Sequence, residues 1–255
     1  AYNVELWKEC LRVLKPGGHL LAFGGTRTYH RMTCAIEDAG FEIRDCIQWI
    51  YGTGFPKSHD ISKAIDKREG YWRGKAGKKL TENRSMVGGN YERSPKGEPV
   101  TTFAKQWSGW GTALKPANEP IVVARKPLSE KTIAENVIKW GTGGLNIDGC
   151  RIAFSSNESA KDLARSSGGF IAQSEIYHND KDKYKISTNS GHSQGRFPAN
   201  VILDEEAGRM LDEQHKGASR FFYCAKASKK ERSEGNNHPT VKPLSLIKYL
   251  ITLVT

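Results

Sequence analysis

The segment KPGGHLLAFGG, Lys15–Gly25, carries alternating helix and strand signals within a few residues. Its first half is a breaker cluster that ends a helix. That helix is predicted by apolar residues spaced 3-4-3, namely Val4, Trp7, Leu11 and Leu14. The apolar run His19–Phe23 predicts a short strand covered on both faces of a parallel sheet. Gly24 and Gly25 then turn the chain into a helix expected over Tyr29–Ala39.

The next segment, Phe41–Tyr51, alternates apolar and polar residues and predicts a strand. One face of this strand is expected to hold its apolar side chains: Phe41, Ile43, Ile47, Trp49 and Tyr51. A later strand is expected over Glu119–Arg125, paired antiparallel with Ile47–Tyr51 across a very long loop. Helix, strand, helix and strand joined by short connections predict an α/β doubly wound fold.

The C-terminal segment NNHPTVKPL, Asn236–Leu244, leads into an apolar helix expected over Ser245–Val254. Pro243 stands at a position where a proline favours the start of a helix. Two neighbouring faces of this helix are apolar, so we expect burial on more than one side: Leu246, Leu250 and Leu253, then Ile247, Ile251 and Val254. Because no later element could cover it, we expect an internal fragment of a longer protein. A complete protein with a processed N-terminus is the alternative.

The composition favours a nucleic-acid partner. The chain of 255 residues has a formal net charge of +11 at pH 7, and neutralising phosphates releases counterions and so drives binding. An anionic membrane is the rival partner, but the sequence has no basic amphipathic helix and no apolar run of membrane-spanning length. The cysteines stand singly: Cys10, Cys34, Cys46, Cys150 and Cys224. This spacing argues against a metal site or a disulfide scaffold and predicts a cytoplasmic location.

Residues 56–118 show no sustained period and are predicted as a basic, aromatic-rich loop. From Pro56 to Glu119, thirteen Lys or Arg against seven Asp or Glu leave a net charge of +6. Cations suit phosphates and rings stack on unpaired bases, so the loop is predicted to contact DNA. The expected contacts are Arg73, Lys75, Lys78, Lys79, Trp107 and Trp110. The alternative is a solvated basic loop whose rings pack beneath it.

Farther along, a helix is expected over Ser129–Trp140 and a short strand or turn over Leu145–Ile152. Strands are expected over Phe197–Leu203 and Arg220–Ala225. No Ser–His–Asp, Cys–His or paired-carboxylate constellation is evident, and His19 is interpreted as structural.

Several motifs together resemble one enzyme family: RVLKPGG (Arg12–Gly18), FGG (Phe23–Gly25), WIYGTGFPK (Trp49–Lys57), LKPANEP (Leu114–Pro120), RFPAN (Arg196–Asn200) and HPTVKP (His238–Pro243). They are similar to motifs of the amino-methylating DNA methyltransferases, and the resemblance covers essentially the whole chain. The first motif is shared by many methyltransferases, whereas its combination with HPTVKP is quite specific.

The resemblance implies a Rossmann-like, S-adenosylmethionine-dependent methyltransferase fold, incomplete at both ends, with long inserted DNA-recognition loops. It implies methyl transfer to adenine N6 or cytosine N4 in double-stranded DNA, without a metal. The family's P-P-Y/F and D-P-F-x-G-S-G motifs are not in this sequence. We therefore expect no catalytic residue in this chain, a catalytic motif upstream of Ala1, and an inactive fragment. Many family members belong to phages or to restriction–modification systems, which suggests a cognate restriction nuclease as partner.

The resemblance also assigns regions and residues. Residues 1–55 and 119–126 would belong to the catalytic core, 127–235 to a target-recognition region, and 236–255 to the start of the cofactor-binding half. Cofactor-binding residues would be His238, Thr240 and Lys242, and the active site would be lined by Phe23, Gly24 and Gly25. Lys57 and Ser58 would face DNA.

Two other functions remain open at this point. One is a DNA-binding module without catalysis, and the other is an RNA or small-molecule methyltransferase of similar fold. The sequence does not determine the oligomeric state, the recognition sequence or the choice between adenine and cytosine.

Overall fold

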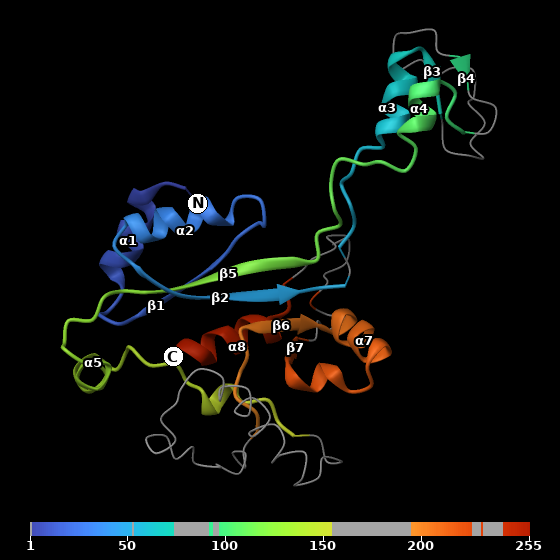
Figure 1. The fold of residues 1–255 in the computed structure, drawn as a ribbon. Helices are drawn as coiled ribbons and strands as arrows, with labels where there is room; N and C mark the ends of the chain where they lie inside the picture. The colour runs from blue at the N-terminus through green and yellow to red at the C-terminus, as the bar shows by residue number, and fades with distance from the viewer. Residues whose placement is uncertain are drawn as a thin grey trace, which may run out of the picture. The chain divides into compact units, whose positions relative to one another are not determined.

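The computed structural model describes residues 2–52, 54–73, 92–93, 97–154, 195–225, 231 and 242–255. They fall into two compact units, whose elements are labelled in Figure 1. The core unit comprises Ala1–Thr53 and Ala117–Thr255, and the inserted unit comprises Gly54–Pro116. The segment predicted as a loop, residues 56–118, overlaps the inserted unit in sequence.

The core unit is built on a five-stranded sheet, which confirms the α/β class. Its strands are β1 (His19–Phe23), β2 (Glu42–Ile50), β5 (Asn118–Arg125), β6 (Val201–Asp204) and β7 (Tyr223–Ala225), in the order β1-β5-β2-β6-β7. β5 is antiparallel to both β1 and β2, whereas β6 is parallel to β2 and β7 is parallel to β6. Four strands therefore run in one direction and β5 runs in the other.

Two predictions about pairing had different outcomes. The antiparallel partner predicted for Ile47–Tyr51 is confirmed, since Trp49 lies opposite Glu119 and Ile47 opposite Ile121. The segment His19–Phe23 is a strand, as predicted, but the parallel neighbours expected for it are wrong. Its sheet partner is the antiparallel β5, and β1 lies at the end of the strand order.

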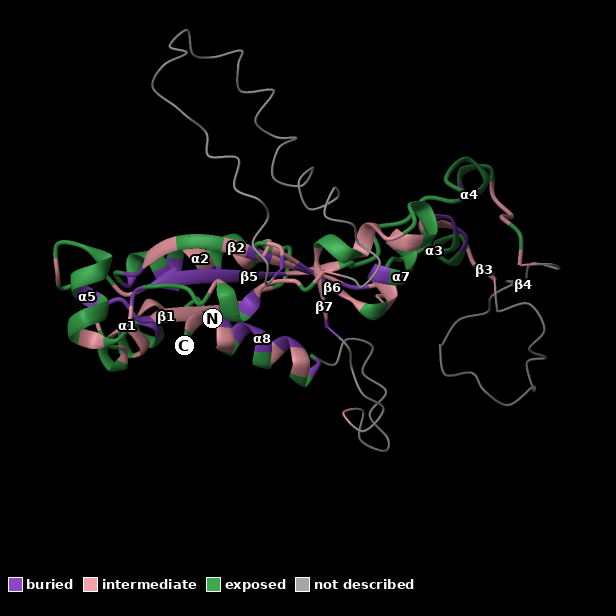
Figure 2. Cartoon of the chain, turned by 90° about the horizontal axis from the view of Figure 1, so that it is seen from below, coloured by how far each residue is buried: buried purple, intermediate pink, exposed green. Residues whose placement is uncertain are grey.

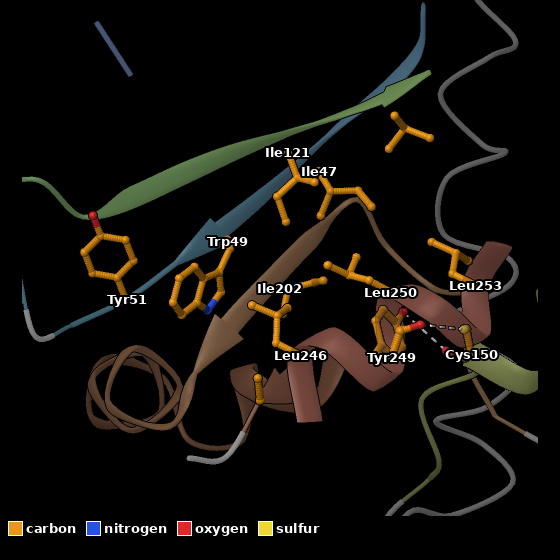
Figure 3. Packing of buried hydrophobic residues seen from close by; sticks show 12 residues of the cluster. Ile47, Trp49, Tyr51, Ile121, Cys150, Ile202, Leu246, Tyr249, Leu250 and Leu253 are labelled. Atoms are coloured by element: carbon orange, nitrogen blue, oxygen red, sulfur yellow. Dashed lines mark hydrogen bonds between the residues drawn. The ribbon is translucent and has the colours of Figure 1, made fainter. Parts of the chain in front are cut away.

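Helices cover both faces of the core sheet. In Figure 1, α1 (Val4–Val13) and α2 (Tyr29–Asp38) lie on one side and α8 (Leu244–Val254) on the other. The first layer buries Trp7 and Ile36, and the second buries Leu246 and Leu250 against Ile202 of β6 (Figure 3). Each fully buried Leu or Ile stabilises the fold by about 1.5–3 kcal/mol.

Strand β5 is the shared centre of the two layers. Figure 2 shows it buried along most of its length. Val122 and Ala124 pack toward α1 and α2, whereas Ile121 and Val123 pack toward α8. This alternation follows from the two-residue period of a strand.

A β-bulge in β2 changes which residues share a face. Ile43 pairs with Ala124, but the next pair is Asp45 with Val123, so Arg44 is an extra residue. Phe41 and Ile43 consequently pack with α1 and α2, while Ile47, Trp49 and Tyr51 beyond the bulge pack with α8. The prediction of one common face from Phe41 to Tyr51 is wrong, because a bulge reverses the alternation.

The terminal helix matches its prediction closely. α8 runs over Leu244–Val254, with Pro243 as the N-cap residue just before it. Leu246, Leu250 and Leu253 are buried, as expected for the sheet-facing side. On the neighbouring face Ile251 is 53% exposed, so burial there is incomplete within the described structure.

The inserted unit contains regular structure that the sequence did not predict. It holds α3 (Ile61–Arg68), α4 (Thr102–Gln106) and a parallel pair of short strands, β3 (Tyr71–Trp72) and β4 (Glu92–Arg93). Among the residues of this unit whose side chains are described, the most deeply buried are Ser62, Asp66 and Ala104. Because two of these three are polar, no apolar period marks the helices in the sequence.

Elsewhere in the core unit, the described residues form α5 (Ile133–Trp140), α7 (Glu205–Gln214) and the 3-10 turns η1 (Asp148–Cys150) and η3 (Ala218–Phe221). α5 is shorter than predicted because Thr132 forms a capping box with Glu135 and starts the helix. α7 was not predicted, since Gly208 is its one buried residue. β6 and β7 lie within residues 127–235 and nevertheless belong to the core sheet.

Candidate functional site

One edge of the core sheet collects the carboxyl ends of four strands. β1, β2, β6 and β7 all end there, and the reversed strand β5 begins there with Asn118. In open α/β sheets, ligands bind outside the carboxyl ends of the strands. This edge is therefore the candidate site.

Lys242 reaches this edge from the segment that enters α8. Its Nζ lies 3.0 Å from Glu119 Oε2. The same ammonium lies 4.9 Å from the centre of the Phe23 ring and 6.0 Å from that of the Trp49 ring. We call these four residues, Phe23, Trp49, Glu119 and Lys242, the clasp. Ring faces attract cations, so β1, β2 and β5 each contribute a group that holds Lys242.

Two members of the clasp, Glu119 and Trp49, were not predicted as site residues. Glu119 faces Trp49 in the β2–β5 register. Trp49 is 2% exposed, and its Nε1 has no hydrogen-bond partner among the described residues. Burial, and then the nearby Glu119 carboxylate, raise the pKa of Tyr51. In the sequence, the one indication that Trp49 and Glu119 belong to a site is that each lies in a motif that carries the family resemblance.

The predicted lining residues Phe23, Gly24 and Gly25 lie at this edge. Gly24 N–H donates to Pro120 O at 2.9 Å and so continues the pairing of β1 with β5. Gly25 O accepts from Tyr29 N at 2.8 Å, which starts α2 directly after the strand. A Cβ on Gly24 would lie 3.3 Å from Tyr29 Cβ and 3.4 Å from Tyr29 Cα, so the close approach of α2 favours glycine there.

Of the predicted cofactor-binding residues, the structure places Lys242 in the clasp. His238 and Thr240 lie outside the described residues. Lys75, Lys78 and Lys79 of the predicted DNA-contacting set also lie outside them.

Lys57 and Ser58 are exposed at the start of the inserted unit. Ser58 Oγ accepts from Thr112 N at 2.9 Å and from Ala113 N at 3.2 Å. The two ends of the inserted unit are thus tied to each other, and Ser58 has a structural role in that tie.

Arg73 lies in the interior of the inserted unit, and its side chain is 4% exposed. Its Nε is 2.9 Å from Asp66 Oδ2, and its Nη2 donates to Ser62 Oγ at 2.6 Å. Asp66 also accepts from Val100 N and Thr101 N, both at 3.0 Å. Arg73 therefore stabilises this unit from within, and the structure does not offer it as a DNA-facing side chain.

Trp107 and Trp110 present an aromatic surface at the end of α4. Their rings meet edge to face, with centres 4.9 Å apart. Trp107 is 37% exposed and Trp110 is 58% exposed. Exposed rings of this size are available for stacking.

The described residues also bear on metal sites, disulfides and membrane-spanning helices. Within the described ranges, no three His, Cys, Asp or Glu side chains come together as metal ligands. The five cysteines are free thiols. Among the helices that the structure describes, none has the length and apolar character needed to cross a bilayer.

Known proteins that are similar to this chain identify its family. The model of the family N6_N4_Mtase, described as DNA methylase, matches residues 1–255. The Type II methyltransferase M.HindIII of Haemophilus influenzae is 29% identical over 146 residues, which are 56% of this chain and 38% of that protein. The chain thus spans less than half the length of this curated relative.

Among solved structures, the crystal structure of the M1.HpyAVI–SAM complex matches with 12% identity and a TM-score of 0.25. The match covers 89% of this chain and 77% of that one. From the family match over its whole length, the chain belongs to the DNA methylase family.

Proposed function

We propose that this member of the DNA methylase family takes part in transferring a methyl group from S-adenosylmethionine to an exocyclic amino group in duplex DNA. The target is N6 of adenine or N4 of cytosine. The observation that carries the proposal is the clasp, which closes the carboxyl edge of the sheet in a chain that matches the family from end to end.

The residues at this edge fit the chemistry of the cofactor, which combines a sulfonium cation, an adenine ring and an amino-acid group. The rings of Phe23 and Trp49 and the carboxylate of Glu119 already surround one cation, the Lys242 ammonium. Gly25 leaves space beside them, since a Cβ there would meet only Thr28 Oγ1 within 4 Å, at 3.8 Å. When bound, the cofactor supplies the activated methyl group.

The chain's own part in this proposal is to position and to bind. Lys242 lies at the sheet edge, and we propose that it borders the cofactor together with His238 and Thr240, which precede it in the sequence by four and two residues. Phe23, Gly24 and Gly25 are proposed to line the neighbouring space. Orienting reactants in this way lowers the entropic part of a reaction barrier.

The inserted unit is proposed to contact DNA. Trp107 and Trp110 are exposed there, and the interval from Pro56 to Glu119 has a net charge of +6. Lys57, Lys75, Lys78 and Lys79 belong to the same proposal, as does a target-recognition role for residues 127–235. An enzyme that modifies a base must take the base out of the stack, and exposed rings and cations suit the displaced strand.

A methyl-transfer assay tests the activity. A form of the protein that also carries the family's P-P-Y/F and D-P-F-x-G-S-G motifs is incubated with labelled S-adenosylmethionine and either duplex DNA or RNA. We expect the label in DNA, on adenine N6 or cytosine N4, and we expect no label with the 255-residue chain alone. Label in RNA alone would exclude the proposal. A cytoplasmic location and a cognate restriction nuclease are parts of the same proposal, and co-purification with a nuclease tests the second.

A DNA-binding module without catalysis is the second candidate, favoured by the exposed Trp pair of the inserted unit. Equilibrium binding of duplex DNA without methyl transfer, in the presence of bound cofactor, would support this candidate over the enzyme.

A further inference from the structure

The chain leaves the core sheet for the inserted unit at Gly52, just beyond the end of β2. Tyr51 N–H donates to Ala117 O at 2.9 Å and so contacts the returning chain that enters β5. Gly52 N–H points to a different element and donates to Asp204 Oδ1 at 3.1 Å. We call this second contact the exit anchor. The outgoing chain is therefore fastened twice, once to the returning chain and once to the end of β6.

Asp204 reaches Gly52 because β6 is parallel to β2. Ile50 pairs with Leu203, so the two strands end side by side (Figure 1). Asp204 follows as the last residue of β6 and the N-cap of α7, and its Oδ1 also accepts from Ala207 N at 2.6 Å. One carboxylate oxygen thus joins the start of α7 to the exit from β2.

The first turn of α7 also closes the space around Gly52. A Cβ on Gly52 would overlap Glu206 Cγ and would lie 2.9 Å from Glu206 Cβ and 3.3 Å from Ala207 N. The φ angle of Gly52 is outside the left-handed region, so space and not backbone conformation is what favours glycine here. Any larger residue would push the outgoing chain away from α7.

A second fastening limits the freedom of the connection to the inserted unit. Fixing the backbone of one residue corresponds to a factor of about 5 to 30 in an equilibrium constant. Where folding has already fixed the connection, that freedom is not lost again when the connected unit binds a ligand. The exit anchor should therefore strengthen whatever binding the inserted unit performs.

We propose that Asp204 is a positioning residue for DNA binding, acting through Gly52 to hold the exit to the inserted unit. The inference rests on the proposed function and deepens it, because the inserted unit is the part proposed to contact DNA. The sign of the effect separates this role from a direct one. An acidic side chain beside DNA repels phosphate, so its removal would tighten binding, whereas removal of an anchor weakens binding.

The test measures the affinity of the whole 255-residue chain for a labelled mixed-sequence duplex by fluorescence anisotropy at several salt concentrations. Asp204→Ala removes the acceptor, and Asp204→Asn keeps an oxygen acceptor. The matched control is Asp212→Ala, which removes another carboxylate of α7, one that accepts from Ser219 N at 2.8 Å. Gly52→Ala disturbs the anchor and keeps the N-cap of α7. Its control is Gly144→Ala, since a Cβ there would meet no atom within 4 Å.

We expect Asp204→Ala and Gly52→Ala each to bind DNA about fivefold more weakly than their controls. The slope of log K against log salt should not change, because the phosphate contacts stay the same. Asp204→Asn should bind within about twofold of the wild type, since asparagine accepts at an N-cap as well as aspartate does. Hydrogen exchange of the Gly52 amide should be about tenfold faster in Asp204→Ala and unchanged in Asp212→Ala.

Affinities of Asp204→Ala and Gly52→Ala equal to those of their controls would overturn the inference, as would tighter binding by Asp204→Ala. Faster exchange at Gly52 with unchanged affinity would also overturn it, because the anchor would then hold the chain without aiding DNA binding. If Asp204→Ala lowers the helical signal in circular dichroism, Gly52→Ala decides alone.

The proposed function can fail separately. Methyl transfer to DNA by the form that carries the family's motifs, with control-like affinities in the variants, would overturn the anchor's role and leave the proposed function intact. Weakened DNA binding in the variants of a form that transfers no methyl group would support the anchor and remove the enzyme.

Discussion

Lys242 Nζ lies 3.0 Å from Glu119 Oε2. This contact joins the segment that enters α8 to the second residue of β5. The side chains are 37% and 20% exposed, so water screens the pair and its strength is modest. Its importance comes from its position. It closes the sheet edge at which β1, β2 and β6 end.

Replacing either partner should loosen this edge. We expect Lys242→Met and Glu119→Gln each to lower the free energy of unfolding by about 1 kcal/mol. The double variant should lose less than the sum, with a coupling of about 0.5–1 kcal/mol, because both changes remove the same contact. Denaturant unfolding of the four proteins measures the coupling. Lys242→Arg, which keeps the charge and the ring contacts, serves as control, and strictly additive losses would contradict the clasp.

Asp66→Asn should unfold the inserted unit locally. The change removes the charge that Arg73 Nε meets at 2.9 Å in the interior and leaves a buried cation unpaired. Breaking a buried ion pair costs about 3–5 kcal/mol. Hydrogen exchange should show lost protection in α3 and α4, while β2 and β5 of the core unit stay protected. Lys63→Met is the control, because its pair with Asp60 is exposed and contributes less than about 1 kcal/mol. Equal protection in both variants would show that the pair does not hold the unit.

The same carboxylate should make the inserted unit sensitive to acid. Burial by itself would raise the pKa of Asp66, but hydrogen bonds from Val100 and Thr101, with the charge of Arg73, hold it below its usual value. A group whose pKa is lowered by folding stabilises the fold above its unfolded pKa. That stabilisation is lost as the pH falls through the folded pKa. Loss of order in the inserted unit is therefore expected below about pH 4, and not near neutrality.

Fluorescence of the exposed Trp107 and Trp110 reports this transition between about pH 2 and 7. In Asp66→Asn the pH dependence should flatten, because the titrating group is gone. A wild-type transition centred near pH 6 would point to a histidine instead.

The sequence predicted those elements whose burial follows a simple period. His19–Phe23, Glu119–Arg125 and the terminal helix are apolar and were located within a residue or two. The helices α3 and α7 were missed because their buried residues are Ser62, Asp66 and Gly208, which give no apolar pattern.

The candidate site was also predicted only in part from the sequence. Phe23, Gly24, Gly25 and Lys242 came from motifs, and the structure brings them to one edge. Glu119 comes to the same edge because β5 pairs with β2 and places Glu119 opposite Trp49. The two residues are far apart in the sequence, so no local pattern predicts that they meet. Arg73 looked like a surface cation because a sequence does not reveal a buried carboxylate such as Asp66.

The bulge at Arg44 permits a test of what assigns side chains to faces in β2. Deleting Arg44 would restore regular alternation, so that Phe41 and Ile43 would turn away from α1 and α2 if the residues beyond the bulge keep their register with β5. Phe41 is 3% exposed, and losing a buried aromatic side chain costs about 3–5 kcal/mol. Since domains are stable by only about 5–15 kcal/mol, the deletion should lower the urea midpoint sharply or prevent folding. Arg44→Ala is the matched control. It keeps the bulge and removes a side chain that is 51% exposed, so its effect should stay within about 0.5 kcal/mol. A deletion variant that unfolds at the same urea concentration as Arg44→Ala would show that the extra residue does not set the two faces.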